Sequence, residues 1–264
     1  MLRLWYKGFI LLIFLQLNTE ISAQSVNADS LELLRKTINA GRIHESCKID
    51  GYLNEAFWSN LPPSKDFIQY SPRNKDHPAF NTVIRFGYDD EALYIGAEMF
   101  DPEPGKLYTE LGLRDKLEEL AVDYVSIDIL PYNDGLNMYE FKVSPSGLQH
   151  DCKYSAVGQD ITWDAVWYSA TRIGDSAWYA EIKIPYSALR FPKNSMQVWG
   201  INMWRCIRRN NEWSTWSYVD NSVTDIFKFY GELKGIENID PPLRLSATPY
   251  LATYIDKNAV SSKW

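Results

Sequence analysis

From about residue 49 onward, the chain is patterned in short runs whose apolar residues fall at every second position. In the clearest run, 92–100, Leu93 and Ile95 begin the apolar set. A period of two puts these side chains on one face of a β-strand and their neighbours on the opposite face. A second run, 82–88, precedes the first across Asp89-Asp90-Glu91. The two runs therefore predict a β-hairpin.

Further strands are predicted along the rest of the chain, at 124–130, 138–143, 163–172, 178–184, 198–205 and 229–233. Turn residues at 131–135 separate the first two of these, and 185–189 predicts a turn or a single helical turn. Eight or more short strands with alternating faces favour stacked sheets over βαβ units. The predicted fold is an all-β, antiparallel two-sheet β-sandwich with short helical turns.

Residues 1–23 have the composition of a cleavable export signal peptide. Arg3 and Lys7 give a positive start, an apolar run follows at 9–17, and small residues at 21–23 fit a cleavage site. The apolar run is shorter than the roughly 18 to 20 residues that cross a bilayer as a helix, so no transmembrane helix is predicted. We expect an exported protein in the periplasm, in the outer membrane or at the cell surface.

Three further segments are distinguished by composition. Residues 24–42 are a polar leader or linker in which 29–39 has the apolar spacing of one short helix. The β-patterned module occupies 43–240. The pair Pro241-Pro242 marks a boundary, and 241–264 is interpreted as the start of a truncated C-terminal domain because it is too short to fold alone.

Charge and the rarer residues exclude several classes of protein. The formal net charge of -7 makes nucleic acid an unsuitable partner. An odd set of cysteines allows at most one internal disulfide and excludes a disulfide scaffold: Cys47, Cys152 and Cys206. The histidines have no spacing typical of a zinc or haem site and are interpreted as having no ligand role: His44, His77 and His150.

The ten tryptophans of the sequence suggest sugar binding, because the flat C–H faces of pyranose rings stack on aromatic rings. Trp163, Trp167 and Trp216 stand beside polar, loop-like stretches, where binding groups of sandwich folds normally lie. Two interpretations of Trp163 and Trp216 remain open, a sugar platform and packing in or at the rim of the core. Tryptophans in apolar positions, such as Trp178, are assigned to the core.

Polar side chains that could hold sugar hydroxyls are Arg114, Asp115, Arg205 and Asn202. A guanidinium group can hold two hydroxyls or a carboxylate in a bidentate manner. The competing interpretation is an ion pair between these arginines and Asp123 or Asp128.

Two motifs carry a resemblance to a known family. The segment 49–58, IDGYLNEAFW, resembles the opening of the family 9 carbohydrate-binding modules, and 86–95, FGYDDEALYI, resembles their first hairpin. Further matches follow in order: 114–115, 122–124, 139–141, 145–147, 178–182, 184–189, 199–202, Arg205 and Trp216. The matches cover the chain from residue 49 to about 231.

The resemblance implies a β-sandwich that binds a polysaccharide or oligosaccharide between tryptophans and contains structural calcium. Asp89, Asp90 and Asp101 are the candidate oxygen ligands, although a hairpin turn explains Asp89 and Asp90 without a metal. The chain also resembles exported bacterial proteins in which such a module precedes a large C-terminal domain. An outer-membrane barrel is one interpretation of that domain, which would bring outer-membrane association.

Three functional hypotheses follow. The leading one is a non-catalytic module that binds carbohydrate and contributes to carbohydrate catabolism. The first alternative is part of a glycoside hydrolase, which needs two carboxyl groups roughly 5 to 10 Å apart, and no sequence feature selects such a pair. The second alternative is a structural periplasmic cap on an outer-membrane barrel.

Overall fold

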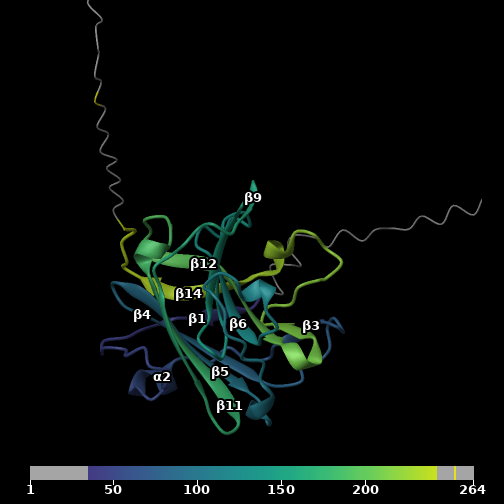
Figure 1. The fold of residues 1–264 in the computed structure, drawn as a ribbon. Helices are drawn as coiled ribbons and strands as arrows, with labels where there is room; N and C mark the ends of the chain where they lie inside the picture. Colours follow the sequence, from purple (N-terminus) through teal and green to yellow (C-terminus); the bar gives the residue numbers. More distant parts are fainter. Residues whose placement is uncertain (1–34, 243–252, 254–264) are drawn as a thin grey trace, which may run out of the picture. The chain divides into compact units, whose positions relative to one another are not determined.

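The computed structural model describes residues 35–242 and residue 253 (Figure 1). Within these residues, nine strands form one sheet and five form another. The predicted signal peptide, the first part of the predicted helix at 29–39 and nearly all of the predicted C-terminal domain lie outside the described residues. None of the helices in the described part of the chain is long and apolar enough to cross a membrane.

The larger sheet has the strand order β1-β14-β12-β6-β7-β8-β9, and β13 and β3 extend it from β12. Its strands are β1 (Thr37–Asn39), β3 (Ile68–Ser71), β6 (Tyr124–Leu130), β7 (Met138–Val143), β8 (Gln149–Ser155), β9 (Gly158–Asp160), β12 (Met196–Ile207), β13 (Glu212–Thr215) and β14 (Gly231–Glu237).

The smaller sheet has the order β10-β11-β5-β4-β2. Its strands are β2 (Gly41–Arg42), β4 (Thr82–Tyr88), β5 (Ala92–Phe100), β10 (Tyr168–Ile173) and β11 (Ala177–Pro185). The helical elements are α2 (Ala56–Asn60) and five 3-10 turns, η1 (Pro104–Lys106), η2 (Leu117–Glu119), η3 (Tyr186–Ala188), η4 (Arg208–Asn210) and η5 (Ile226–Phe229). The turn η3 confirms the prediction at 185–189.

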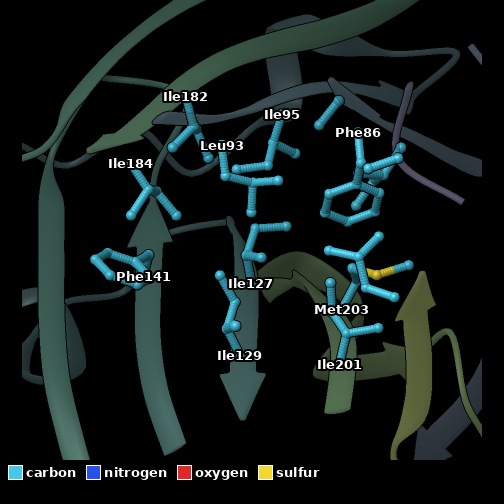
Figure 2. Close-up of a cluster of buried hydrophobic side chains, with 14 of the residues drawn as sticks. Phe86, Leu93, Ile95, Ile127, Ile129, Phe141, Ile182, Ile184, Ile201 and Met203 are labelled. Carbon is cyan, nitrogen blue, oxygen red and sulfur yellow. The ribbon is translucent and has the colours of Figure 1, made fainter. Parts of the chain in front are cut away.

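The hydrophobic core lies between the two sheets. Figure 2 shows side chains of β4, β5 and β11 facing those of β6, β7 and β12, with Ile95 and Ile127 among them. These residues are the apolar members of the alternating runs, and both Ile95 and Ile127 are fully buried. Burial of this apolar surface is the main contribution that holds the two sheets together.

Four strands coincide with the predicted ranges: β4, β5, β6 and β7. Their alternation is strong because one face of each strand packs in the core. The predicted strand 163–172 is shorter in the structure, since β10 begins at Tyr168 and the preceding residues form a loop. The strand β8 was not predicted, because Asp151 and Cys152 are buried on opposite faces and leave no apolar alternation.

The sheets are mixed rather than purely antiparallel. The strand β1 pairs in parallel with β14, and β2 pairs in parallel with β4. Residues 37–42 therefore belong to the sandwich, although the sequence predicted a linker and the end of a helix there. The cause is tertiary packing, because Ile38 and Ala40 are buried in the core and Ala40 donates its amide to the carbonyl of Lys234.

The first family-like motif is fixed to β11 by a buried carboxylate. Glu181 accepts hydrogen bonds from the backbone amides of Asp50 and Gly51 and from the indole of Trp58. Its side chain is fully buried, and burial raises the pKa of Glu181. The segment 49–58 thus has a structural role in this chain.

Candidate functional site

A pocket lies on the outer face of the nine-stranded sheet, opposite the core. In β6 and β7, Ile127 and Phe141 point into the core, so their neighbours Asp128 and Glu140 point the other way. Asp128 and Glu140 are paired in register across the two strands. Side chains around η5 cover this face and help to enclose a volume of about 380 Å³.

The pocket combines aromatic, charged and hydroxyl side chains. They come from β6, β7, β8, β12 and the segment around η5: Tyr124, Ser126, Asp128, Met138, Glu140, Lys142, Tyr154, Trp204, Thr224, Ile226, Phe227 and Tyr230. The alternation of the strands explains the composition, because each lining residue of β6 and β7 is next in sequence to a core residue.

The charged floor of the pocket is centred on Lys142. Its Nζ lies 3.1 Å from Glu140 Oε2 and also pairs with Glu118 of η2. Burial alone lowers the pKa of the Lys142 amine, but the carboxylates of Glu140 and Glu118 outweigh it and raise that pKa well above its usual value. Lys142 is therefore a fixed ammonium group that is only 7% exposed.

The carboxyl group of Asp128 lies deeper in the same floor. Burial, and then the negative charge of Glu140, raise the pKa of Asp128 to about 7. Tyr230 donates a hydrogen bond of 2.6 Å to Oδ2, and Ser126 donates one of 2.8 Å to Oδ1. These two bonds oppose the shift and hold the carboxyl group in one orientation.

Aromatic rings form the remaining walls. Trp204, which is partly exposed, makes an edge contact with Tyr70 at 5.2 Å between ring centroids. On the side of η5, Phe227 makes edge contacts with Tyr154 and Tyr230. A flat apolar ligand surface can stack on such rings while the charged floor hydrogen-bonds to hydroxyl groups.

Arg114 and Asp115, predicted as sugar-binding residues, lie outside this pocket. The guanidinium of Arg114 bonds to Gln149, Asp151 and the carbonyl of Ala165, and its Nε lies 3.6 Å from Asp115 Oδ2 and 3.4 Å from Asp164 Oδ1. Asp115 in turn accepts the backbone amide of Asp151. Arg114 therefore pairs with three carboxylates, those of Asp115, Asp151 and Asp164, where the loop meets β8.

Trp163 and Trp167 close the end of the core beside this loop. Trp167 is 3% exposed and donates its indole N–H to Asp151 Oδ1 at 2.9 Å. Trp163 is partly buried and packs on Tyr139 and Phe141, with centroid distances of 5.1 and 6.0 Å. Of the two interpretations of Trp163, the structure favours packing at the rim of the core.

Trp216 is a core residue, and the ammonium group of Lys36 lies 5.7 Å from the centroid of its ring. Trp216 is 3% exposed, and a Cβ added to Gly231 would lie 2.6 Å from its ring. Of the two interpretations of Trp216, the structure favours packing in the core.

Arg205 and Asn202 are fully buried and have backbone partners. Arg205 donates to the carbonyls of Asn81 and Phe100, at 2.9 and 2.8 Å. The Asn202 side chain bonds to both the amide and the carbonyl of Ser217. Neither side chain is free to bind a sugar.

The aspartates predicted to bind calcium do not form one site. Asp89 and Asp90 lie in the turn before β5, Asp101 follows β5, and nine residues of extended strand separate them by roughly 30 Å. Asp89 accepts the amides of Glu91 and Ala92, which confirms a hairpin turn. None of the acidic and metal-ligating clusters in the described part of the chain includes these three aspartates, so their arrangement does not fit calcium.

None of the pocket residues is predicted from sequence to bind a ligand. Glu140 and Lys142 stand at alternate positions of the predicted strand 138–143, which favours solvent exposure or an ion pair, and the structure contains that ion pair. One signal was available: polar residues at every second position of two adjacent strands, 124–130 and 138–143, define a continuous polar face. The segment around η5 covers that face, and no pattern in its sequence predicts this position.

A β-sandwich that carries an aromatic and charged pocket on one outer sheet face is a ligand-binding module. The profile of the carbohydrate family 9 binding domain-like family matches residues 49–225, which is more than half of the chain. The chain therefore belongs to this family.

Solved structures share the fold. A family 9 carbohydrate-binding module from Caldicellulosiruptor kristjanssonii in complex with cellotriose has a TM-score of 0.55 and 18% identity, over 81% of this chain and 100% of that one. The same kind of module from that organism in complex with glucose has a TM-score of 0.54 and 19% identity, over 78% and 100%.

A third structure, of a candidate carbohydrate-binding protein from Bacteroides uniformis, has a TM-score of 0.59 and 12% identity, over 76% of this chain and 99% of that one. At these identities the likenesses establish the fold alone. No curated protein matches the chain in sequence.

Proposed function

We propose that this domain binds carbohydrate without cleaving it, in the pocket on the outer face of the nine-stranded sheet. The observation that carries the proposal is the combination, in one pocket of about 380 Å³, of aromatic walls with a fixed charged floor. Membership of the carbohydrate family 9 binding domain-like family supports it. So do the sugars, cellotriose and glucose, in the modules of similar fold.

The pocket residues can contact different parts of a sugar. Trp204 offers a partly exposed ring on which the C–H face of a pyranose can stack. Lys142 and Glu140 offer a charged donor and acceptor for hydroxyl groups, and their mutual ion pair fixes their positions in advance. A floor with more carboxylates than ammonium groups favours neutral sugars over uronates.

Calorimetric titration with cellotriose and glucose tests the proposal. We expect the unmodified protein to bind one of them or a related neutral oligosaccharide, and Trp204→Ala to weaken binding at least tenfold. The matched control is Trp163→Ala, which removes a tryptophan outside the pocket and is expected to leave affinity unchanged while the protein is folded. Lost binding in Trp163→Ala, with Trp204→Ala unaffected, would place the sugar at the Arg114 loop instead.

Hydrolysis is the second candidate function, because Asp128 and Glu140 face each other across β6 and β7 and the pKa of Asp128 is raised. Glycosidases use such carboxyl pairs. However, both Asp128 oxygens are engaged by Tyr230 and Ser126, and Lys142 pairs with Glu140. We therefore expect no new reducing ends when the protein is incubated with cellotriose, and their appearance would establish the enzyme.

We also propose that the module works outside the cytoplasm, in the periplasm, in the outer membrane or at the cell surface. The basic, apolar and small-residue order of residues 1–23 supports export. Amino-terminal sequencing of the protein recovered from the cell envelope is expected to begin near residue 24. Recovery of the uncleaved chain from the cytoplasm would contradict this proposal.

A further inference from the structure

Three side chains with metal-ligating atoms meet beside the pocket. Glu140 of β7 is paired in register with Cys152 of β8, and His150 stands two residues before Cys152 on the same face. The three are buried, and their ligand atoms lie within 4.8 Å of one another. The spacing of these residues in the sequence is not typical of a zinc site, because strand pairing brings the three side chains together.

The hydrogen bond made by Nδ1 of His150 determines which ring nitrogen is free. Nδ1 lies 3.2 Å from the backbone carbonyl oxygen of Asp115, and a carbonyl only accepts, so Nδ1 carries the proton. In the neutral ring Nε2 then presents a lone pair toward the cluster. A histidine whose other nitrogen donates to a backbone carbonyl is oriented as metal-binding histidines are.

The lone pair of His150 Nε2 is unpaired in the protein. Nε2 is buried without a hydrogen-bond partner, and the nearest anionic atom, Glu140 Oε2, lies 3.9 Å away. The distance is too long for a hydrogen bond, and a lone pair facing a carboxylate oxygen is unfavourable unless a cation lies between them. A buried unpaired nitrogen of this kind needs a bound species to account for it.

Cys152 completes the group. Its thiol donates to Glu140 Oε2 at 3.1 Å, and the amide of Gln159 in β9 donates to Sγ at 3.4 Å. Burial and the negative charge of Glu140 raise the pKa of the Cys152 thiol, so the thiolate forms only where a cation replaces the thiol proton. Lys142 also touches Glu140 Oε2, but it has a second partner in Glu118 and keeps that partner if the Oε2 lone pairs are taken up elsewhere.

We propose that Glu140, His150 and Cys152 form a binding site for a divalent transition-metal ion of the zinc class. Tetrahedral zinc with sulfur, nitrogen and oxygen ligands needs ligand atoms about 3.3 to 3.6 Å apart. The observed 3.1 and 3.9 Å lie on either side of this range. The thiol and the imidazole select zinc-like ions over calcium and magnesium, which take oxygen ligands.

Binding is balanced by the release of one proton. The Cys152 thiol gives up its S–H proton to solvent as the sulfur–metal bond forms. His150 binds through the unpartnered lone pair of Nε2, and Glu140 binds through the Oε2 lone pair that accepted the thiol proton. The fourth position is left for water or for a hydroxyl of a ligand in the adjacent pocket, because Glu140 lines both. The site shares Glu140 with the proposed sugar pocket, so metal binding is tested without sugar.

The test uses the metal-free protein and Co²⁺ as a spectroscopic probe, followed by Zn²⁺ in calorimetry. We expect one ion per chain, a thiolate-to-cobalt absorption band, and release of about one proton per ion. Cys152→Ser and His150→Gln are each expected to weaken Zn²⁺ binding at least tenfold and to abolish or shift the band. Cys206→Ser is the matched control, since it removes a buried free thiol elsewhere and should bind as the unmodified protein does.

Two results would overturn the proposal. One is the absence of Zn²⁺ binding to the unmodified protein, which would leave a water molecule as the partner of His150 Nε2. The other is equal binding by the unmodified protein and Cys152→Ser. Thermal melting of each variant without metal shows whether it folds, and in the unmodified protein Zn²⁺ is expected to raise Tm in proportion to its occupancy.

Discussion

At the residue scale, the buried charged groups of this sandwich differ in whether they have a partner in the fold. Asp128 is the clearest case of an acid held in an environment that favours its neutral form. Burial and the charge of Glu140 raise its pKa to about 7, whereas the pKa of an aspartate in an unfolded chain is about 4.

The first prediction concerns the pH dependence of stability. Because the pKa of Asp128 is raised in the folded state, that state keeps a proton which the unfolded chain loses between about pH 4 and 7. The contribution of Asp128 therefore lowers the free energy of unfolding as pH rises through this window, by on the order of 4 kcal/mol. Asp128→Asn is expected to remove that contribution, as measured by urea denaturation at several pH values.

Asp160→Asn is the control for this experiment. Asp160 is exposed, and a hydrogen bond from Thr162 lowers its pKa, so its replacement should leave the decline in place. A decline of equal size in Asp128→Asn and the unmodified protein would show that other groups cause it.

The second prediction concerns Arg205, which ties the two sheets together. It belongs to β12, and it donates to the carbonyl of Asn81, which precedes β4, and to that of Phe100 at the end of β5. Lysine cannot reproduce the fork of two N–H groups. We expect Arg205→Lys to cost about 2 to 4 kcal/mol of unfolding free energy, measured by denaturant unfolding.

Arg73→Lys is the comparison for Arg205→Lys. Arg73 is a surface residue whose side chain is 74% exposed and paired with Asp76, so its replacement should change stability by less than about 0.5 kcal/mol. Similar small effects at both positions would mean that the buried hydrogen bonds of Arg205 do not hold the sheets.

At the scale of elements, residues 37–42 are the largest departure from what the sequence predicts. Their two short strands pair in parallel, one in each sheet. Isolated runs of two or three residues have no readable alternation, and the partner of β1 lies almost 200 residues further along the chain. Only the assembled core shows why Ile38 is buried.

The third prediction tests whether β1 is part of the stable fold. Ile38 is 5% exposed and packs in the core, so Ile38→Ala is expected to cost about 2 to 4 kcal/mol. Asn39→Ala, at the exposed neighbouring position, should cost less than about 0.5 kcal/mol. Equal, small effects in denaturant unfolding would show that residues 37–42 act as the linker that the sequence predicts.

Strands with one face in the core could be predicted to the residue, as 82–88 and 124–130 demonstrate. The candidate site could not be predicted from sequence, because its position depends on which faces of the strands are covered by other segments. Trp216 stands in a polar stretch but is buried against β14, and Asn202, within the predicted strand 198–205, is buried by the segment after β13. Conversely, Glu140 and Lys142 looked like solvent-facing strand residues, and the segment around η5 encloses them.

At the scale of the whole molecule, the fold is maintained without covalent cross-links. Cys47, Cys152 and Cys206 are all free thiols, and the last two are buried. Burial raises the pKa of Cys47 and of Cys206 to about 12. Neither is therefore an efficient nucleophile at neutral pH.

The fourth prediction follows from these thiols. Under non-reducing, denaturing conditions we expect three alkylated cysteines per chain by mass spectrometry, and in the native protein slow alkylation at Cys152 and Cys206. Tm should be the same with and without reductant, since there is no disulfide to lose. A mass two units lower with one blocked pair, together with a Tm that falls on reduction, would contradict the free-thiol structure.

The parallel pairing of β1 with β14 has a mechanical consequence. In a parallel pair, the N-terminal end of one strand and the C-terminal end of the other lie at opposite ends of the ladder. A pull applied through the sequences before β1 and after β14 therefore loads the bonds of this pair together, in shear, instead of opening them one at a time. A pull between the two flanks of the sandwich is therefore resisted by all the hydrogen bonds of the β1–β14 pair at once.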